Sequence, residues 1–215
     1  MLVPNSPSGG DAFARLTNPF SVQPATEDGF YGRDQELDIL IQRSLGSGES
    51  TIVVSEFPNG KGSLVRELQR RLQDEICRIS FVDAQTLHHT CTPDQFWYQA
   101  LSQLGAPRRP RYAYRDVASL LAGASGERRI LIIDGIQVIA HLPAFAYPDP
   151  WGMLRAFTQS QGLVLVGTSN VDLVALTEMT RNLTLGSPFF NAMRELVLGP
   201  LDAAGAATPS RARVA

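Results

Sequence analysis

A short apolar run that leads into a loop with a glycine–lysine pair is the feature that most constrains this chain's fold. The run is Thr51-Ile52-Val53-Val54, and the loop from Ser55 to Ser63 opens a helix-patterned segment. A strand that turns through such a loop into a helix presents backbone N–H groups to an anion. The Gly60-Lys61 pair places a positive charge where the outer phosphates of a ligand would lie. The sequence therefore predicts a phosphate-binding loop between a buried strand and a helix.

The loop departs from the pattern G-x-x-x-x-G-K-[ST], in which the first glycine allows a tight turn and the final hydroxyl binds Mg²⁺. Ser55 stands at the first glycine, Gly62 replaces the hydroxyl residue, and Pro58 removes one backbone donor. Ser63 does carry a hydroxyl, but one residue along a helix turns a side chain by about 100°. We therefore expect Ser63 to face an α-phosphate rather than a metal ion.

Short apolar runs alternate with amphipathic segments along the chain, which is the pattern of a parallel sheet covered by helices. The predicted strands are Thr51 to Val54, Ile79 to Val82, Ile130 to Ile133, Leu163 to Val166 and Glu195 to Leu198. The predicted helices are about 34–44, 61–75, 93–104, 115–122 and 150–160. Five strands as apolar as these predict one α/β sheet that is buried on both faces.

Length and composition fit one globular domain. The chain has 215 residues, of which 44% are hydrophobic, and a net charge of −2. We expect a core over residues 18–202, with disordered segments at 1–17 and 203–215 because these show no periodic apolar face. The mildly acidic charge gives no global attraction to nucleic acid or to an anionic membrane.

Cysteine content and hydropathy indicate the cellular compartment in which the protein is expected. Two isolated cysteines, Cys77 and Cys91, provide neither a disulfide framework nor a zinc site. No apolar run approaches the roughly 20 residues of a membrane-spanning helix. We expect a cytoplasmic protein without a membrane partner or a metal centre.

Two further strands end in polar residues. Arg129-Ile130-Leu131-Ile132-Ile133 leads into Asp134-Gly135, which resembles a Walker B strand with its Mg²⁺-orienting carboxylate. In many ATPases a glutamate that polarises the attacking water follows this carboxylate, and Gly135 stands in its place. The strand at Leu163 to Val166 leads into Gly167-Thr168-Ser169-Asn170, and Asn170 matches the polar sensor-1 position.

The order of these blocks resembles the AAA+ and STAND groups of P-loop NTPases, including their origin-recognition-like branch. Upstream, Phe30-Tyr31-Gly32-Arg33-Asp34-Gln35-Glu36-Leu37 resembles the segment that those families place near the adenine. Downstream, Ser187-Pro188-Phe189-Phe190-Asn191 is similar to the end of the same core. The resemblance implies a three-layer, ASCE-type P-loop domain whose parallel sheet has the order 5-1-4-3-2. Because few residues follow Asp202, we expect no helical lid domain.

The resemblance also implies a ligand and its contacts. The expected ligand is ATP or ADP with weak or no Mg²⁺. The expected nucleotide-binding residues are Gly60, Lys61, Gly62, Ser63, Asp134, Asn170, Tyr31, Gly32 and Arg33. Because the Walker A hydroxyl and the Walker B glutamate are missing, we assign no catalytic residue and expect a pseudo-ATPase that regulates or contacts another protein.

Two alternatives stay open from the sequence. The first is an active ATPase that a partner subunit completes, in which Arg181 is a candidate arginine finger. The second is a nucleic-acid-associated module that uses Arg108, Arg109 and Arg111. A short basic loop in a mildly acidic protein is usually only solvated, so this alternative is less favoured.

Overall fold

The computed structural model describes residues 30–56, 59–73, 75, 77–105, 109, 112–122, 127–160, 162–183 and 188–201. The segments 1–17 and 203–215, expected to be disordered, lie outside these residues. So do the loop residue Pro58, Ser187, and Arg108 and Arg111 of the basic loop.

Five parallel strands form one sheet in the order β2-β3-β4-β1-β5. This is the predicted order 5-1-4-3-2 and confirms the fold class. The strands are β1 (Thr51–Val54), β2 (Cys77–Asp83), β3 (Arg128–Asp134), β4 (Leu163–Ser169) and β5 (Arg194–Val197). Every residue of β4 is buried, as expected of a central strand covered on both faces.

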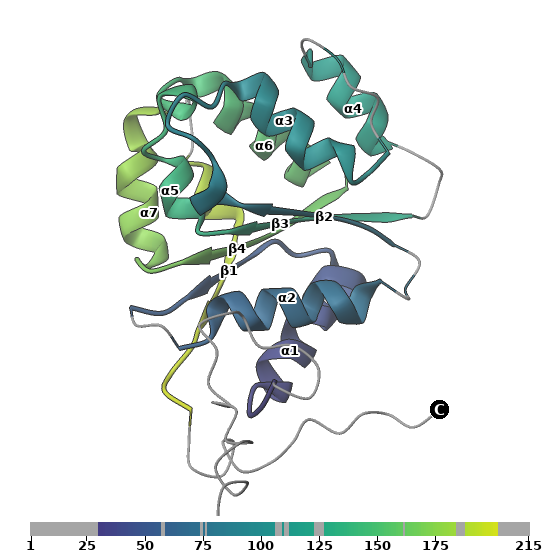
Figure 1. Ribbon diagram of the computed structural model, residues 1–215, viewed down its shortest axis with the longest axis vertical. Helices are drawn as coiled ribbons and strands as arrows, with labels where there is room; N and C mark the ends of the chain where they lie inside the picture. The colour runs from purple at the N-terminus through teal and green to yellow at the C-terminus, as the bar shows by residue number, and fades with distance from the viewer. Residues whose placement is uncertain are drawn as a thin grey trace, which may run out of the picture.

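Helices cover both faces of the sheet and make three layers (Figure 1). One face carries α1 (Asp34–Ile41), which continues as a π-helix (Gln42–Ser47), and α2 (Lys61–Leu72). The other face carries α3 (Pro93–Ser102), α4 (Tyr114–Ala122), α5 (Ile136–Ile139), α6 (Pro148–Ser160) and α7 (Leu173–Thr180). Short 3₁₀ turns lie at Ala84–Thr86, Pro143–Phe145, Arg181–Leu183 and Phe189–Ala192.

The sheet separates two apolar cores because successive residues of a strand point to opposite faces. On β1, Val53 packs with Leu64 and Leu68 of α2, whereas Ile52 packs in the core of the other face. That second core holds both tryptophans, Trp97 and Trp151. No helix among the described residues is long and apolar enough to cross a bilayer.

Local capping explains where several helices begin. Thr92 and Gln95 form a reciprocal capping box at the start of α3, with Pro93 in the first turn. Asp172 accepts a hydrogen bond from the N–H of Ala175 and so caps α7. The sequence prediction lacked α7, although Asp172 marks its start.

Candidate functional site

The predicted phosphate-binding loop leaves β1 at the carboxyl edge of the sheet and enters α2. The N–H of Ser55 donates to the carbonyl of Ser169 (3.1 Å), which ties the start of the loop to the end of β4. Ser55 is 3% exposed, and its hydroxyl accepts a hydrogen bond from Asn59 Nδ2 (2.9 Å). The side chain that replaces the first glycine therefore holds the loop together.

Gly60 caps α2 in the left-handed region, with φ of +83°, and a Cβ there would meet no atom within 4 Å. Glycine is favoured by the backbone angle and not by a lack of space. Lys61, Gly62 and Ser63 follow as the first residues of α2, so the predicted loop-to-helix junction is present.

Lys61 turns back on the loop, and its Nζ donates to the carbonyl of Ser55 (2.6 Å). Burial lowers the pKa of the Lys61 ammonium below its ordinary value, and the Asp134 carboxylate opposes part of that shift. This influence places Lys61 and Asp134 within electrostatic range of each other. Lys61 of the loop and Asp134 at the end of β3 therefore influence each other electrostatically.

A buried threonine holds the carboxylate at the end of β3. Thr168, which is 1% exposed on β4, donates from its hydroxyl to Asp134 Oδ1. The same hydroxyl accepts a hydrogen bond from the N–H of Gly135 (2.8 Å). One side chain therefore fixes both residues of the Walker B-like end.

Gly135 adopts φ of +82° and caps the four-residue helix α5. A glutamate in this place would have to occupy the left-handed region, which costs a non-glycine residue roughly 1–2 kcal/mol. The backbone at the Walker B-like end therefore favours the glycine that the sequence carries.

The contact to Asp134 comes from Thr168, which the sequence did not single out as a site residue. Asn170 is exposed, directly beyond the end of β4. It lines a cavity of about 710 Å³ together with Ser55, Asn59 and Glu56 of the loop. Asn170 thus lies beside the loop, and its sensor role stays a prediction.

Three carboxylates line this loop-side cavity, from Glu56, Asp172 and Glu195. Two of them act on the first turn of α7, because Asp172 accepts from Ala175 N and Glu195 accepts from Leu173 N (3.0 Å). Negative side chains oppose phosphate binding in this cavity.

Arg33 braces the segment that was predicted to lie near an adenine. Its guanidinium is buried and donates to Glu36 Oε1 (2.7 Å), to the carbonyl of Asn59 (3.3 Å) and to the carbonyl of Gly199. Tyr31 is 39% exposed, and Gly32 has φ of +68°. Arg33 therefore links the segment before α1 to the loop and to the chain after β5.

The remaining charged candidates have surface partners. Arg181 forms an ion pair with Glu178 (3.3 Å) and is 68% exposed, whereas Arg109 pairs with Asp116 (3.1 Å). Among the residues that the structure describes, no cluster of three or more His, Cys, Asp or Glu side chains could hold a metal ion.

No protein-family model and no curated protein matches the chain. Solved structures do match it. The Walker-type ATPase PABY2304 of Pyrococcus abyssi aligns with a TM-score of 0.61 at 14% identity, over 87% of this chain and 59% of that chain. The chain thus spans about three fifths of that archaeal ATPase.

Two further solved structures match as well. A chain of Drosophila ORC bound to DNA aligns with a TM-score of 0.53 at 10% identity, over 77% of this chain and 87% of that chain. Cdc6p of Pyrobaculum aerophilum aligns with a TM-score of 0.50 at 17% identity, over 76% and 44%. At these identities the likeness establishes the fold alone, which is the α/β fold of a P-loop NTPase.

Proposed function

We propose that this chain binds ATP or ADP over Gly60, Lys61, Gly62 and Ser63 and acts as a regulatory module that contacts another protein, with little or no hydrolysis. The observation that carries the proposal is the junction of β1 and α2. There, a left-handed Gly60 starts the helix, and Lys61 lies within electrostatic range of Asp134. Such a junction offers backbone N–H groups, a helix N-terminus and one cation to phosphates.

Weak hydrolysis follows from what flanks the junction. Gly62 has no hydroxyl to ligate Mg²⁺, and Gly135 has no carboxylate to polarise water. Positioning and charge stabilisation carry most of the catalysis in phosphoryl transfer, so both losses act on the chemical step. Nucleotide binding, in contrast, needs only the loop and Lys61.

We expect ATP binding to depend only weakly on Mg²⁺ because of the hydrogen bond that Asp134 already accepts. One of its carboxylate oxygens already accepts the Thr168 hydroxyl. A bound ion would gain few protein oxygens here, since Mg²⁺ prefers a nearly ideal octahedron and keeps several waters. We therefore expect chelation of Mg²⁺ to weaken ATP binding by less than about threefold.

Calorimetry with ATP and with ADP, each with and without Mg²⁺, tests the proposal. Lys61→Met should weaken binding by about tenfold or more, because a charge-assisted contact to phosphate is lost. Arg194→Met, which alters an exposed arginine at the start of β5, at the edge of the sheet opposite the loop, serves as the control and should bind like the natural protein. Absence of binding by the natural protein in all four conditions would refute nucleotide binding.

The chain offers a second, covalent readout because Lys61 is its only lysine. An ATP acyl phosphate, which transfers its acyl group to a lysine amine and releases ATP, should label Lys61, and excess ATP should prevent this. An acyl phosphate without the nucleotide is the matched reagent, and because no nucleotide directs it to the loop, it should label Lys61 much more slowly at the same concentration. Equal labelling of Lys61 with and without excess ATP would contradict occupancy of the loop.

Turnover separates a pseudo-ATPase from an ATPase that a partner completes. The purified chain should hydrolyse ATP no faster than Lys61→Ala. Clear Lys61-dependent turnover by the chain alone would show that the low-hydrolysis part of the proposal is wrong while leaving nucleotide binding intact.

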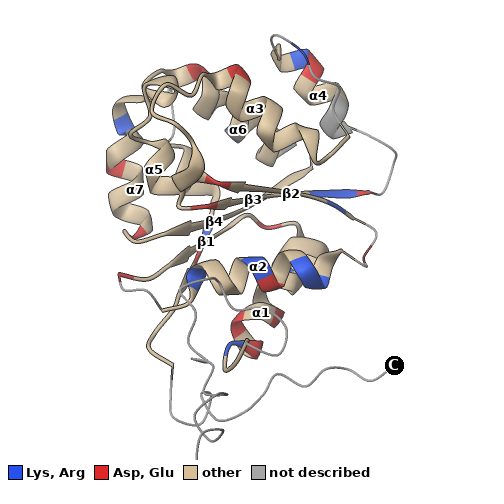
Figure 2. Ribbon diagram, viewed as in Figure 1, with Lys and Arg blue, Asp and Glu red and all other residues tan. Residues whose placement is uncertain are grey.

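Nucleic-acid binding receives less support from the described arginines. Arg70 and Arg71 pair with the buried carboxylate of Glu67, and Arg78 and Arg129 pair with Glu127. Figure 2 shows basic and acidic residues interspersed over the elements rather than gathered on one face. DNA binding that falls steeply with salt would revive this alternative.

A further inference from the structure

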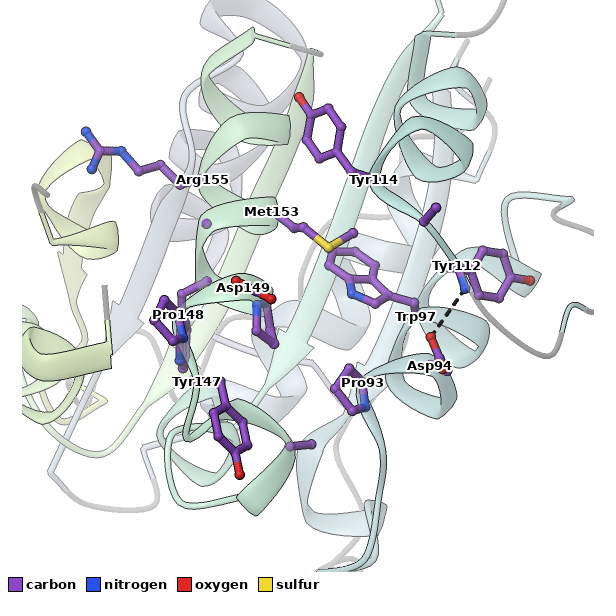
Figure 3. Close-up of a pocket in the computed structure, with 15 residues that line it drawn as sticks. Pro93, Asp94, Trp97, Tyr112, Tyr114, Tyr147, Pro148, Asp149, Met153 and Arg155 are labelled. Atoms are coloured by element: carbon purple, nitrogen blue, oxygen red, sulfur yellow. Dashed lines mark hydrogen bonds between the residues drawn. The ribbon is translucent and has the colours of Figure 1, made fainter. Parts of the chain in front are cut away.

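A second cavity, of about 760 Å³, lies among α3, α4, α6 and the turn at Pro143–Phe145 (Figure 3). We call it the α3–α6 cavity. It lies on the face of the sheet opposite α2, and its lining shares no residue with the phosphate-binding loop. Its volume falls in the range of about 300–1,000 Å³ that is typical of small-molecule sites.

Aromatic side chains dominate the wall of this cavity. They are Trp97, Tyr112, Tyr114, Tyr147 and Trp151. The two tryptophans are buried, whereas Tyr114 is 45% and Tyr147 is 66% exposed. Large aromatic groups that remain exposed at the rim of an apolar cavity are typical of a binding site.

The charged side chains that line the cavity are two carboxylates and one guanidinium. Asp94 and Asp149 both line it, and Asp94 Oδ1 accepts only a long hydrogen bond from the N–H of Tyr112 (3.3 Å) among the contacts of the described residues. Arg155 also belongs to the lining, but its Nε donates to Gln159 (3.2 Å), and its guanidinium points away from the cavity in Figure 3. The two carboxylates thus outnumber the single guanidinium of the lining, which is directed elsewhere.

The two tryptophans differ in one respect that matters for a ligand. Trp151 Nε1 donates to the carbonyl of Phe145 (2.9 Å). Trp97 is 2% exposed, and its Nε1 has no hydrogen-bond partner among the described residues. Figure 3 shows the indole of Trp97 projecting from α3 toward the Asp149 side of the cavity. A buried N–H without an acceptor is unfavourable, so an acceptor on a ligand would be stabilised there.

We propose that the α3–α6 cavity binds a small organic cation, a protonated amine or a quaternary ammonium ion, that also carries an oxygen acceptor. Aromatic faces attract cations through their quadrupoles, and Asp149 and Asp94 supply the opposite charge. An anion would be repelled by the same carboxylates. A neutral apolar ligand would leave both the carboxylates and the Trp97 N–H without a partner.

Tryptophan fluorescence gives a direct test, because the chain has two tryptophans and both line this cavity. Choline is the probe, and 3,3-dimethylbutan-1-ol, which has the same shape without the charge, is its matched control. Choline should change the fluorescence saturably and bind about tenfold more tightly than the alcohol, since a cation–π contact with a nearby carboxylate supplies the difference.

Variants assign the effect to the cavity. Asp149→Asn should weaken choline binding by about fivefold or more and leave binding of the alcohol unchanged. Tyr147→Leu, at a 66% exposed position that folding tolerates, should also weaken choline binding. Glu178→Gln removes an exposed charge on α7 outside the cavity and should behave like the natural protein.

Three results would overturn the proposal. The first is equal affinity for choline and the alcohol. The second is no saturable response and no calorimetric heat with choline, phenyltrimethylammonium and butylammonium at about 10 mM, which is far above the affinity expected of a built site. The third is unchanged choline affinity in the Asp149→Asn variant, which would show that this carboxylate does not face a bound cation.

Discussion

Replacing Thr168 by valine should destabilise the fold more than its small change in shape predicts. The hydroxyl donates to Asp134 and accepts from the N–H of Gly135 (2.8 Å), and Thr168 is 1% exposed. Thr168→Val keeps the volume, but it leaves a carboxylate oxygen and a backbone N–H without their partner. Loss of a hydrogen bond to a charged group costs about 1.5–3 kcal/mol, and an unsatisfied buried donor costs about 1–3 kcal/mol. Allowing for relaxation, we expect Thr168→Val to lower the free energy of unfolding by about 2–4 kcal/mol.

Urea denaturation followed by circular dichroism measures this loss, and Thr168→Ser is the matched control. Serine keeps the hydroxyl and removes one methyl group, which should cost about 1 kcal/mol. If Thr168→Val is no less stable than Thr168→Ser, the hydroxyl does not hold the Walker B-like end. A double-mutant cycle with Asp134→Ala should also give a coupling of about 0.5–3 kcal/mol, and strict additivity would contradict the contact.

Three further outcomes follow from the packing and the charges. Arg33→Met should lower the free energy of unfolding by about 3 kcal/mol, because it leaves the Glu36 carboxylate and two backbone carbonyls without their donor. An unchanged free energy of unfolding in urea titration would show that these contacts do not stabilise the fold. Gly167→Ala should lower the free energy of unfolding by about 1–3 kcal/mol, because its Cβ would lie 2.7 Å from an isoleucine methyl. Gly152→Ala, in open space on α6, should raise it by about 0.5–1 kcal/mol. If Gly152→Ala melts at a lower temperature than Gly167→Ala, this account of the packing is wrong. Burial raises the pKa of the Cys91 thiol, so in a Cys77→Ser background its alkylation rate should still rise as the pH passes 9.0, and a plateau below that pH would disprove the shift.

The sheet was predictable because its strands are apolar on both faces. The predicted Thr51 to Val54 coincides with β1, while β2 extends beyond the predicted Ile79 to Val82 to include Cys77 and Asp83. The ends were missed because backbone pairing continues past the last buried side chain, as the register between Asp83 and Asp134 shows. Hydropathy records burial and not the length of a hydrogen-bonded ladder.

The candidate site was predictable in its motifs but not in its contacts. Gly60 and Lys61 lie where the pattern predicts, at the start of α2. Hydropathy predicts that the fourth strand ends at Val166, although β4 runs to Ser169. With the strand that long, Thr168 is still in the ladder and faces Asp134, while Asn170 falls beyond it. A polar run at the end of a strand does not reveal which residue has which orientation.

The edge strand β5 has a consequence for how copies of this chain behave at high concentration. It pairs with β1 on one side, and in the described part of the chain no strand pairs with its other side. Its residues Arg194 and Glu195 are exposed, and Val197 is 65% exposed. Charged side chains on a short edge strand discourage a second chain from adding to the sheet. We therefore expect Arg194 and Glu195 to disfavour edge-to-edge association of copies of this chain, and replacing both by valine should extend the exposed apolar surface of Val197 along the edge and promote aggregation.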